Sequence, residues 1–337
     1  MAKTINGTPK RLALALSGGG FRAAAFHLGV MRKMKELGLL HALDLLSCVS
    51  GGSIAGAFLA SNWTSPTVLD DLERYLATRS IAISSVIGGV LDPFESRLDK
   101  LARSYDRDLF HAAKLSALRA GPRIYLNATN LSTGNMFFFV AGGEKPEEMG
   151  EHELGVVPAE GFSIASAVAA SSAFPPVFPP LRLDREEYAP AEKTDYVTLT
   201  DGGIYDNMGV NPTLRDRNKI DYLIVSDGGK PFANSMNPTE SGGLVLKAAL
   251  DIMMEQIRGL EFDRMQHRHL AGKGPVPLWF SIDSEEGEAQ RGDAQFASAV
   301  GTNLSALSAV QLEMLQRHGG ALVEARLRKY APELLIP

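Results

Sequence analysis

Two short apolar segments, each followed at once by a glycine cluster, constrain the fold more than any other feature of the sequence. Residues 11–16 precede Gly18-Gly19-Gly20, and residues 43–49 precede Ser50-Gly51-Gly52. Apolar residues at helical spacing follow the two clusters, over 21–39 and 53–61. A strand, a loop and a helix in this order, repeated, are typical of a parallel sheet covered by helices. We therefore expect an α/β protein.

The rest of the chain continues this pattern. Short apolar segments predict further strands over 123–129, 136–140, 196–200, 220–226 and 277–282. Helical spacing predicts helices within 66–118 and over 162–172, 244–270 and 306–330. A Gly- and Glu-rich loop is expected over 141–160, and an exposed charged segment over 181–195. No internal repeat and no clear linker divides the chain, which favours one domain.

Composition excludes several classes of protein. The 337 residues include 34 basic and 39 acidic side chains without a basic run, which argues against a dedicated nucleic-acid binder. A single cysteine, Cys48, excludes a disulfide framework and a Cys-based structural zinc site. The apolar stretch 12–30 is interrupted by Gly18-Gly19-Gly20 and contains Arg22 and His27, so it predicts neither a membrane span nor a signal peptide. We expect a cytoplasmic protein, with non-classical export or peripheral membrane association left open.

The glycine cluster at 18–20 is suited to binding negative charge. Glycine permits close approach of the backbone and unusual dihedral angles, and the cluster stands where a helix is expected to begin. Amides at a helix N-terminus favour an anion, such as a phosphate or the oxyanion of an acyl-transfer intermediate. A tight turn that only packs the helix on the strand is the alternative.

The second cluster predicts a nucleophilic serine. A nucleophile elbow lies between a strand and a helix, and small residues two positions before and after the serine prevent clashes. Gly51 and Ala55 take these places around Ser53, which makes Ser53 the candidate nucleophile. A Gly/Ser helix cap without a catalytic role is the alternative.

Two aspartates are candidates for the base that would activate this serine. Asp201-Gly202-Gly203 and Asp227-Gly228-Gly229 each follow a predicted strand, and ligands of open α/β sheets bind at the carboxyl ends of strands. At least one copy is expected only to shape a turn, since Asp-Gly is a common turn dipeptide. None of the seven histidines lies in a glycine-rich or turn motif. An aspartate acting directly on the serine, as a dyad, is thus the alternative to the usual histidine.

Together these motifs resemble the patatin-like phospholipase family, whose catalytic core is similar to that of cytosolic phospholipase A2. The matching segments occur in the family's order: Gly18-Gly19-Gly20-Phe21-Arg22, 51–55, 127–134, 170–176 and 201–207. Order and spacing agree over 11–230. The resemblance implies a three-layer α/β sandwich with a central, mostly parallel sheet flanked by helices. It also implies one catalytic domain over 8–335, with a C-terminal helical extension from about 244 to 335.

The resemblance also assigns roles to residues. It implies Ser53 as the nucleophile and Asp201 as its base, and leaves Asp227 structural. Three backbone amides would form the oxyanion hole, those of Gly18, Gly19 and Gly20. Arg22 would hold this loop in shape or bind a phosphate-bearing substrate. Ala23 and Ala55 replace family glycines, but both are small enough to preserve the geometry.

The reaction implied by the resemblance is hydrolysis of an acyl lipid through an acyl-enzyme, without a metal or other cofactor. The substrate class is a phospholipid or other acyl lipid, cleaved as by a phospholipase A or a lysophospholipase. A transient contact with a membrane surface and no nucleic-acid partner are expected, and the oligomeric state is left open. The apolar stretch 81–90 and the helical stretch 244–257 could line an acyl channel or a lid, or could belong to the core.

Three other interpretations remain open from the sequence. A Ser-His-Asp esterase of the α/β-hydrolase type would use a late histidine such as His318. A nucleotide-binding protein would use Gly18-x-Gly20-x-x-Ala23 as a dinucleotide fingerprint, although Asp44 opens the second strand rather than closing it. A non-catalytic lipid-binding module would have no use for a serine and an aspartate together.

Overall fold

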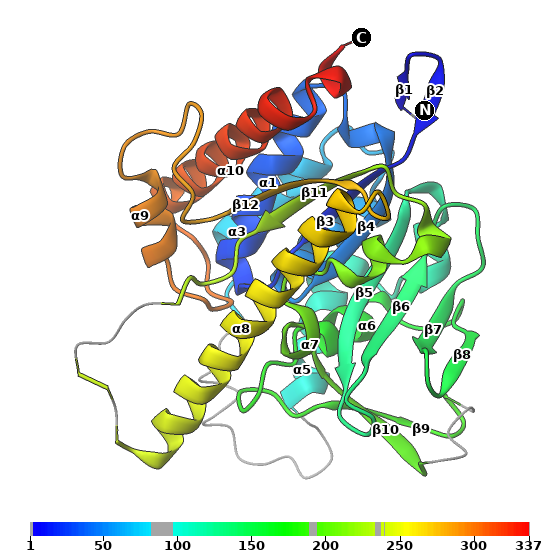
Figure 1. Ribbon diagram of the computed structural model, residues 1–337. Helices are drawn as coiled ribbons and strands as arrows, with labels where there is room; N and C mark the ends of the chain where they lie inside the picture. Colours follow the sequence, from blue (N-terminus) through cyan, green and yellow to red (C-terminus); the bar gives the residue numbers. More distant parts are fainter. Residues whose placement is uncertain (1–2, 82–96, 189–193, 233–236, 239, 337) are drawn as a thin grey trace.

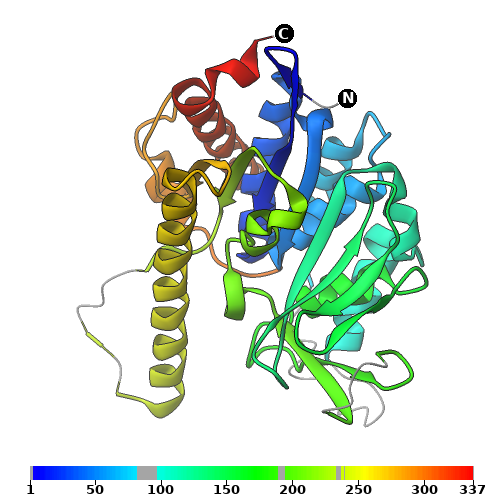
Figure 2. The ribbon, with the colours of Figure 1, turned by 45° about the vertical axis from the view of Figure 1, so that its right-hand side comes forward.

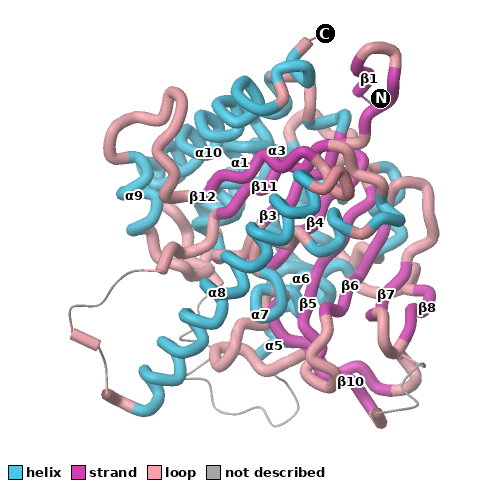
Figure 3. Tube along the Cα trace, viewed as in Figure 1, coloured by secondary structure: helices cyan, strands magenta, loops and turns pink. Residues whose placement is uncertain are grey.

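A ten-stranded sheet runs through the molecule (Figures 1 and 3). The computed structural model describes residues 3–81, 97–188, 194–232, 237–238 and 240–336. Five strands form the parallel part of the sheet, in the order β12 (Val276–Ser281), β11 (Tyr222–Asp227), β3 (Leu12–Leu16), β4 (Leu43–Val49) and β5 (Arg123–Asn130). The sheet continues antiparallel through β6 (Met136–Ala141), β7 (Glu148–Glu151) and β8 (Gly155–Pro158).

Two further strands lie off this order, and they matter for the site. Strand β10 (Tyr196–Asp201) pairs antiparallel with the last residues of β5, and β9 (Leu181–Asp184) pairs with β10. A separate hairpin is formed near the N-terminus by β1 (Lys3–Ile5) and β2 (Thr8–Lys10). The segments 141–160 and 181–195 therefore hold short strands that the sequence analysis did not predict.

Helices cover both faces of the sheet and make three layers. Along β3, Leu12, Leu14 and Leu16 enter the larger core, whereas Ala13 and Ala15 enter a smaller one. The larger core includes residues of α1 (Gly20–Glu36), α2 (Gly51–Ser61), α3 (Val68–Thr78), α5 (Arg97–Tyr105), α6 (Ile164–Ser171), α9 (Asp293–Ala299) and α10 (Ala309–Tyr330). The smaller core is closed by residues 208–214 and by the end of α8 (Gly242–Leu270). The α/β fold class is confirmed.

The C-terminal third contributes to the sheet as well as adding helices. Strand β12 pairs with β11 at the sheet edge, and α10 packs along α1. The two helices approach closely at Gly29, where a side chain would overlap the carbonyl of Gln316. The expected extension over 244–335 thus supplies an edge strand, and we keep a single domain over 8–335 as a proposal.

Two of the sequence expectations concern possible membrane or lipid-channel segments. The stretch 81–90 lies outside the described residues, apart from Ile81. The stretch 244–257 falls within α8, as predicted. No helix in the described ranges combines the length and apolar content that a membrane span needs.

Candidate active site

The pairing of strand β5 brings two loops together. Its residues 123–127 pair with β4, and its residues 128–130 pair with β10. Val49 therefore pairs with Asn127 while Asp201 pairs with Ala128, the next residue along β5. The C-terminal ends of β4 and β10 therefore meet beside β5. The residue that follows Val49 lies next to Asp201.

That residue is Ser50, and it has the backbone of a nucleophile elbow. Its φ of 51° and ψ of −115° lie in a region that a residue with a side chain rarely adopts. Ser50 is half-buried, whereas the following residues 51–60 of α2 are all buried. A side chain at Gly51 would overlap the carbonyl of Gly20, and one at Gly52 would overlap that of Leu16. The strained turn is thus held by tight packing and presents Ser50 at the strand–helix junction.

Ser53 lies elsewhere, inside the first turn of α2. Its side chain is fully buried, and its Oγ lies 2.8 Å from Oγ of Ser171. The Ser171 hydroxyl donates to the carbonyl of Asn127 at 2.6 Å and accepts from the Ser50 amide at 3.0 Å. Ser53 is therefore the donor to Ser171. Through Ser171, which binds the Ser50 amide, the pair stabilises the backbone of the elbow. The expectation that Ser53 is the nucleophile is replaced by a proposal for Ser50.

Asp201 is a buried carboxyl at the end of β10. Its Oδ1 accepts from the Gly203 amide at 2.7 Å. Burial raises its pKa to about 7, and the Gly203 amide and the nearby Ser50 hydroxyl partly oppose this rise. Its Oδ2 meets no donor at ordinary hydrogen-bond geometry among the described residues. The Ser50 side chain thus faces the carboxyl through a loose contact, and the carboxyl is poised to titrate near neutrality.

The glycine loop at 18–20 lies beside Ser50. A side chain at Gly18 would come within 3.2 Å of Cβ of Ser50. The Gly18 amide is already used, since it donates to the carbonyl of Asn207 at 3.1 Å. Within the described ranges no protein acceptor faces the amides of Gly19 and Gly20, whose φ values are 139° and 61°. These two amides, at the N-terminus of α1, are therefore the free donors of the loop, and Gly18 is not among them.

Arg22 is wholly buried beneath this loop. Its guanidinium donates to the carbonyl of Val300 at 3.1 Å and to that of Gly228 at 3.0 Å. Burial lowers its pKa to about 10, against the opposing charge of Asp227. Of the two roles expected for Arg22, the geometry fits holding the loop in shape, because no part of the side chain reaches solvent.

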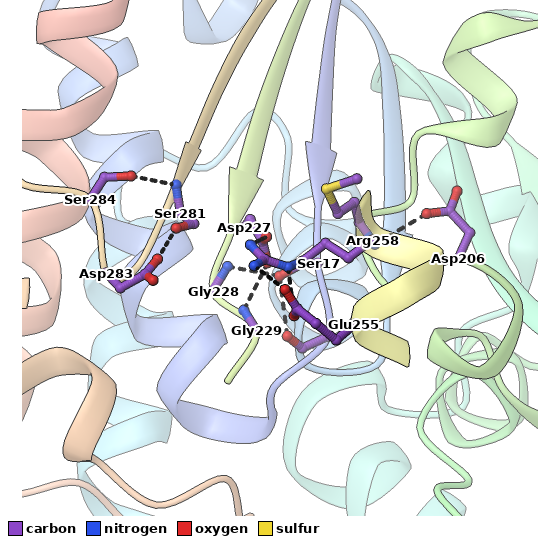
Figure 4. A network of polar contacts seen from close by, with 12 residues as sticks. Ser17, Asp206, Asp227, Gly228, Gly229, Glu255, Arg258, Ser281, Asp283 and Ser284 are labelled. Atoms are coloured by element: carbon purple, nitrogen blue, oxygen red, sulfur yellow. Dashed lines mark hydrogen bonds and ion pairs between the residues drawn. The ribbon is translucent and has the colours of Figure 1, made fainter. Parts of the chain in front are cut away.

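Asp227 ends β11 and takes part in a different network, shown in Figure 4. Its Oδ1 accepts from the Gly229 amide at 3.1 Å, and its Oδ2 pairs with Arg258 of α8 at 3.4 Å. Arg258 also pairs with Glu255 at 2.7 Å. The Gly228 amide donates to the Ser17 hydroxyl at 2.8 Å. Asp227 thus shapes the turn after β11 and anchors α8, which suits the structural role that the resemblance implies.

The histidines do not join Ser50 and Asp201. His27 bonds to the Ser226 hydroxyl at 2.8 Å and to the Ser17 carbonyl at 3.0 Å, and burial lowers its pKa to about 4. His318 is buried against the carbonyl of Ile282 at 2.9 Å. The structure describes all seven histidines. No histidine hydrogen-bonds to Ser50, Ser53 or Asp201. The structure gives no support to a Ser-His-Asp triad.

Asn207 is a site residue that the sequence analysis did not single out. Its carbonyl holds the Gly18 amide, and its Oδ1 fills the space that a side chain at Gly18 would need. The same oxygen lies 2.6 Å from where a Cβ of Gly203 would stand. Asn207 therefore sits between the glycine loop and the Asp201 loop. The signal for it was its place at the end of the 201–207 segment.

Comparison with known proteins identifies the family. The model of the Patatin-like phospholipase family matches residues 14–214, more than half of the chain. The protein therefore belongs to the patatin-like phospholipase family. A comparison with curated protein sequences finds no match.

Solved structures of one human enzyme show the same fold at low sequence identity. Human GIVD cytosolic phospholipase A2 is 14% identical, with a TM-score of 0.62 over 96% of this chain and 60% of that chain. The same human enzyme in complex with methyl γ-linolenyl fluorophosphonate has a TM-score of 0.58, at 14% identity over 96% of this chain and 59% of that one. VipD from Legionella pneumophila is 16% identical, with a TM-score of 0.44 over 98% and 70% of the two chains. The chain spans about 60% of the length of the human enzyme.

Proposed function

We propose that the protein is a serine lipid acyl hydrolase in which Ser50 is the nucleophile and Asp201 its base. One observation carries the proposal. The elbow residue Ser50 faces a buried carboxyl whose pKa is raised to about 7, beside two free amides of a glycine loop. Membership of the patatin-like phospholipase family supports the reaction class.

The proposed reaction has two halves. Ser50 Oγ attacks the ester carbonyl carbon while its proton passes to Asp201, and the oxyanion accepts from the amides of Gly19 and Gly20. Asp201 then returns the proton to the leaving alkoxide, which departs and leaves an acyl-Ser50. Water attacks this ester while Asp201 takes its proton. Asp201 then passes that proton to the Ser50 oxygen as the acyl–oxygen bond breaks, which releases the fatty acid and restores the Ser50 hydroxyl. The chain's own groups therefore account for every proton transfer without a metal or other cofactor.

The proposed substrate is a phospholipid or other acyl lipid, cleaved as by a phospholipase A or a lysophospholipase. The family supports this class, as does the likeness in fold to a phospholipase A2 whose structure holds a linolenyl fluorophosphonate. Reaching such a substrate implies transient contact with a membrane surface.

Release of fatty acid from a lipid panel tests this function. We expect hydrolysis of phosphatidylcholine, lysophosphatidylcholine or a soluble 4-nitrophenyl ester, and none by Ser50→Ala. A fluorophosphonate probe should stop the reaction and label one residue, which fragmentation of the labelled peptide would assign to Ser50. Absence of both hydrolysis and labelling would favour the non-catalytic lipid-binding module.

Arg22→Gln is expected to lower kcat about 10²-fold on every ester substrate, because it releases the loop that carries the Gly19 and Gly20 amides. KM should change little. Comparing a phospholipid with a neutral ester of the same chain length separates this positioning role from phosphate binding. A loss confined to the phospholipid would mean that Arg22 binds the phosphate after all.

A further inference from the structure

Helix α8 has two halves with different surroundings. The C-terminal half is anchored to the rest of the molecule. Asn211 donates to Glu261 at 3.0 Å and accepts from Arg264 at 2.7 Å. Phe262 packs edge-on against Trp279 at 5.0 Å, and Met265 is wholly buried. The position of this half is therefore fixed by the core.

The N-terminal half extends beyond the sheet and the helices that cover it, as Figures 1 and 2 show. Along residues 244–260 the most exposed large apolar residues recur every seven positions: Leu246 is 73% exposed, Met253 61% and Leu260 67%. Other exposed apolar residues flank this row, namely Leu244, Val245 and Ile252. We call residues 244–260 with this exposed row the apolar arm. A monomer rarely keeps so long an apolar row in water without a use for it.

The charges of the arm are paired along another stripe. Lys247 pairs with Asp251, and Glu255 with Arg258, which also reaches Asp227. These four are the charged residues of 244–260, so the arm has no net charge. An arm that is apolar, uncharged and exposed is suited to the interfacial region of a bilayer, where burial of apolar area supplies the attraction. The overall charge of −5 makes electrostatic attraction to an acidic membrane unfavourable.

The arm also adjoins the candidate active site. Met254 follows the exposed Met253, and its methyl group lies 3.3 Å from where a Cβ of Gly203 would stand. Gly203 in turn donates its amide to Asp201. One turn of α8 thus faces solvent on one side and the Asp201 loop on the other, so a surface that holds the arm would lie next to Ser50 and Asp201.

A second copy of the chain is the rival occupant. Leu246, Leu250, Met253, Ile257 and Leu260 alternate at spacings of four and three, as in a coiled coil. The row covers only two heptads, however, and the arm's charges are already paired within the helix. A coiled-coil seam usually needs three or four heptads. The lipid surface is the better fit.

We propose that the apolar arm of α8 inserts into a lipid surface and seats the protein there with its candidate active site at the interface. The lipid surface is of the neutral, phosphatidylcholine type. This inference rests on the proposed function, because it is the acyl-lipid substrate that gives the arm a surface to enter.

Vesicle flotation with the full-length chain carrying Ser50→Ala tests the docking without turnover. We call this Ser50→Ala protein with an unchanged arm the parent, and we expect it to bind phosphatidylcholine vesicles. The same protein with Leu246→Gln/Met253→Gln/Leu260→Gln, the arm variant, should bind at least tenfold more weakly. The matched control is Leu131→Gln/Val310→Gln/Ile336→Gln, whose residues are 54%, 59% and 64% exposed. The control should bind within twofold of the parent. Equal binding by the arm variant and the parent would overturn the proposal.

Activity and mass measurements separate the remaining outcomes. With Ser50 intact, the arm variant should lose at least tenfold more activity on phosphatidylcholine vesicles than on a soluble 4-nitrophenyl ester. Vesicle binding without hydrolysis of any ester would leave the docking standing and contradict the proposed function. Ester hydrolysis without vesicle binding would support the proposed function and contradict the docking. A parent dimer that the arm variant converts to a monomer, with no vesicle binding, would assign the arm to a second copy.

Discussion

Ser50→Ala is expected to lower kcat for ester hydrolysis by about 10⁶-fold, as loss of a serine nucleophile typically does. Ser53→Ala is expected to stay within about tenfold of wild type, because its hydroxyl bonds to Ser171 rather than facing Asp201. Initial rates on a soluble ester, normalised to folded protein, measure both. The soluble ester keeps membrane contact out of the comparison.

The two serines also differ in what they contribute to stability. Ser53→Ala removes a buried hydrogen bond and should lower the free energy of unfolding by about 0.5–1.5 kcal/mol. Ser50→Ala removes a half-buried hydroxyl with one loose contact, so its effect on unfolding should be smaller. Urea unfolding of the two variants checks this. An inactive Ser53→Ala that unfolds like wild type, beside an active Ser50→Ala, would return the nucleophile to Ser53.

The sequence was sufficient for the loops of the site but not for the choice of serine. The strand 43–49 was predicted with its observed bounds, and the elbow residue is the one that stands between strand and helix. A motif counted from Gly51 put the serine three residues further on, inside α2. Counting from Cys48 gives Ser50, with Cys48 where a glycine is usual. The backbone angles of Ser50 favour the second count, and these angles depend on packing against Leu16 and Gly20.

The choice between the two Asp-Gly-Gly segments also depends on long-range pairing. Asp201 and Asp227 each end a strand and each accept from the amide two residues on. They differ because β10 pairs with the end of β5, beside Val49, whereas β11 lies on the far side of β3. No local pattern encodes that pairing, and only the resemblance to the family distinguished Asp201.

The sequence could not predict the short strands or the exposure of α8, because neither leaves a clear periodic pattern. Strands β7, β8 and β9 have four residues each and mixed burial, so they lack a long alternating pattern. The apolar residues of α8 surround most of the helix. Periodicity therefore predicted a helix but not which side of it would be covered.

Asp201→Asn is expected to lower kcat/KM by about 10⁴-fold, because an amide cannot take the Ser50 proton. Asp227→Asn should lose about tenfold or less, since Asp227 pairs with Arg258 and shapes a turn. A parallel assay of the two variants on the soluble ester makes the comparison. Full activity of Asp201→Asn would exclude it as the base.

The pH dependence of the wild-type enzyme tests the same assignment. In the proposed mechanism the carboxylate is the active form, and burial raises the pKa of Asp201 to about 7. As pH falls through 7 the base becomes protonated, so kcat/KM should fall toward tenfold per pH unit and should level off above about pH 8. A profile that stays flat down to pH 5 would contradict a base with this pKa.

Stability should follow pH in the opposite direction. The unfolded chain binds the Asp201 proton with an ordinary pKa near 3.9, whereas the folded protein holds it up to about 7. Between these values the folded state binds more protons, so this group's contribution to the free energy of unfolding is full below pH 4 and is lost as pH rises through 7. An asparagine does not titrate, so Asp201→Asn removes this pH-dependent loss of unfolding free energy. The Tm of the variant relative to wild type should therefore rise from pH 4 to pH 8. Asp227→Asn should show a smaller rise, because burial raises the pKa of Asp227 as well but the charge of Arg258 opposes that rise. If Asp201 is a base whose charged form is destabilised by burial, Asp201→Asn should be inactive toward the ester and more stable than wild type at pH 8.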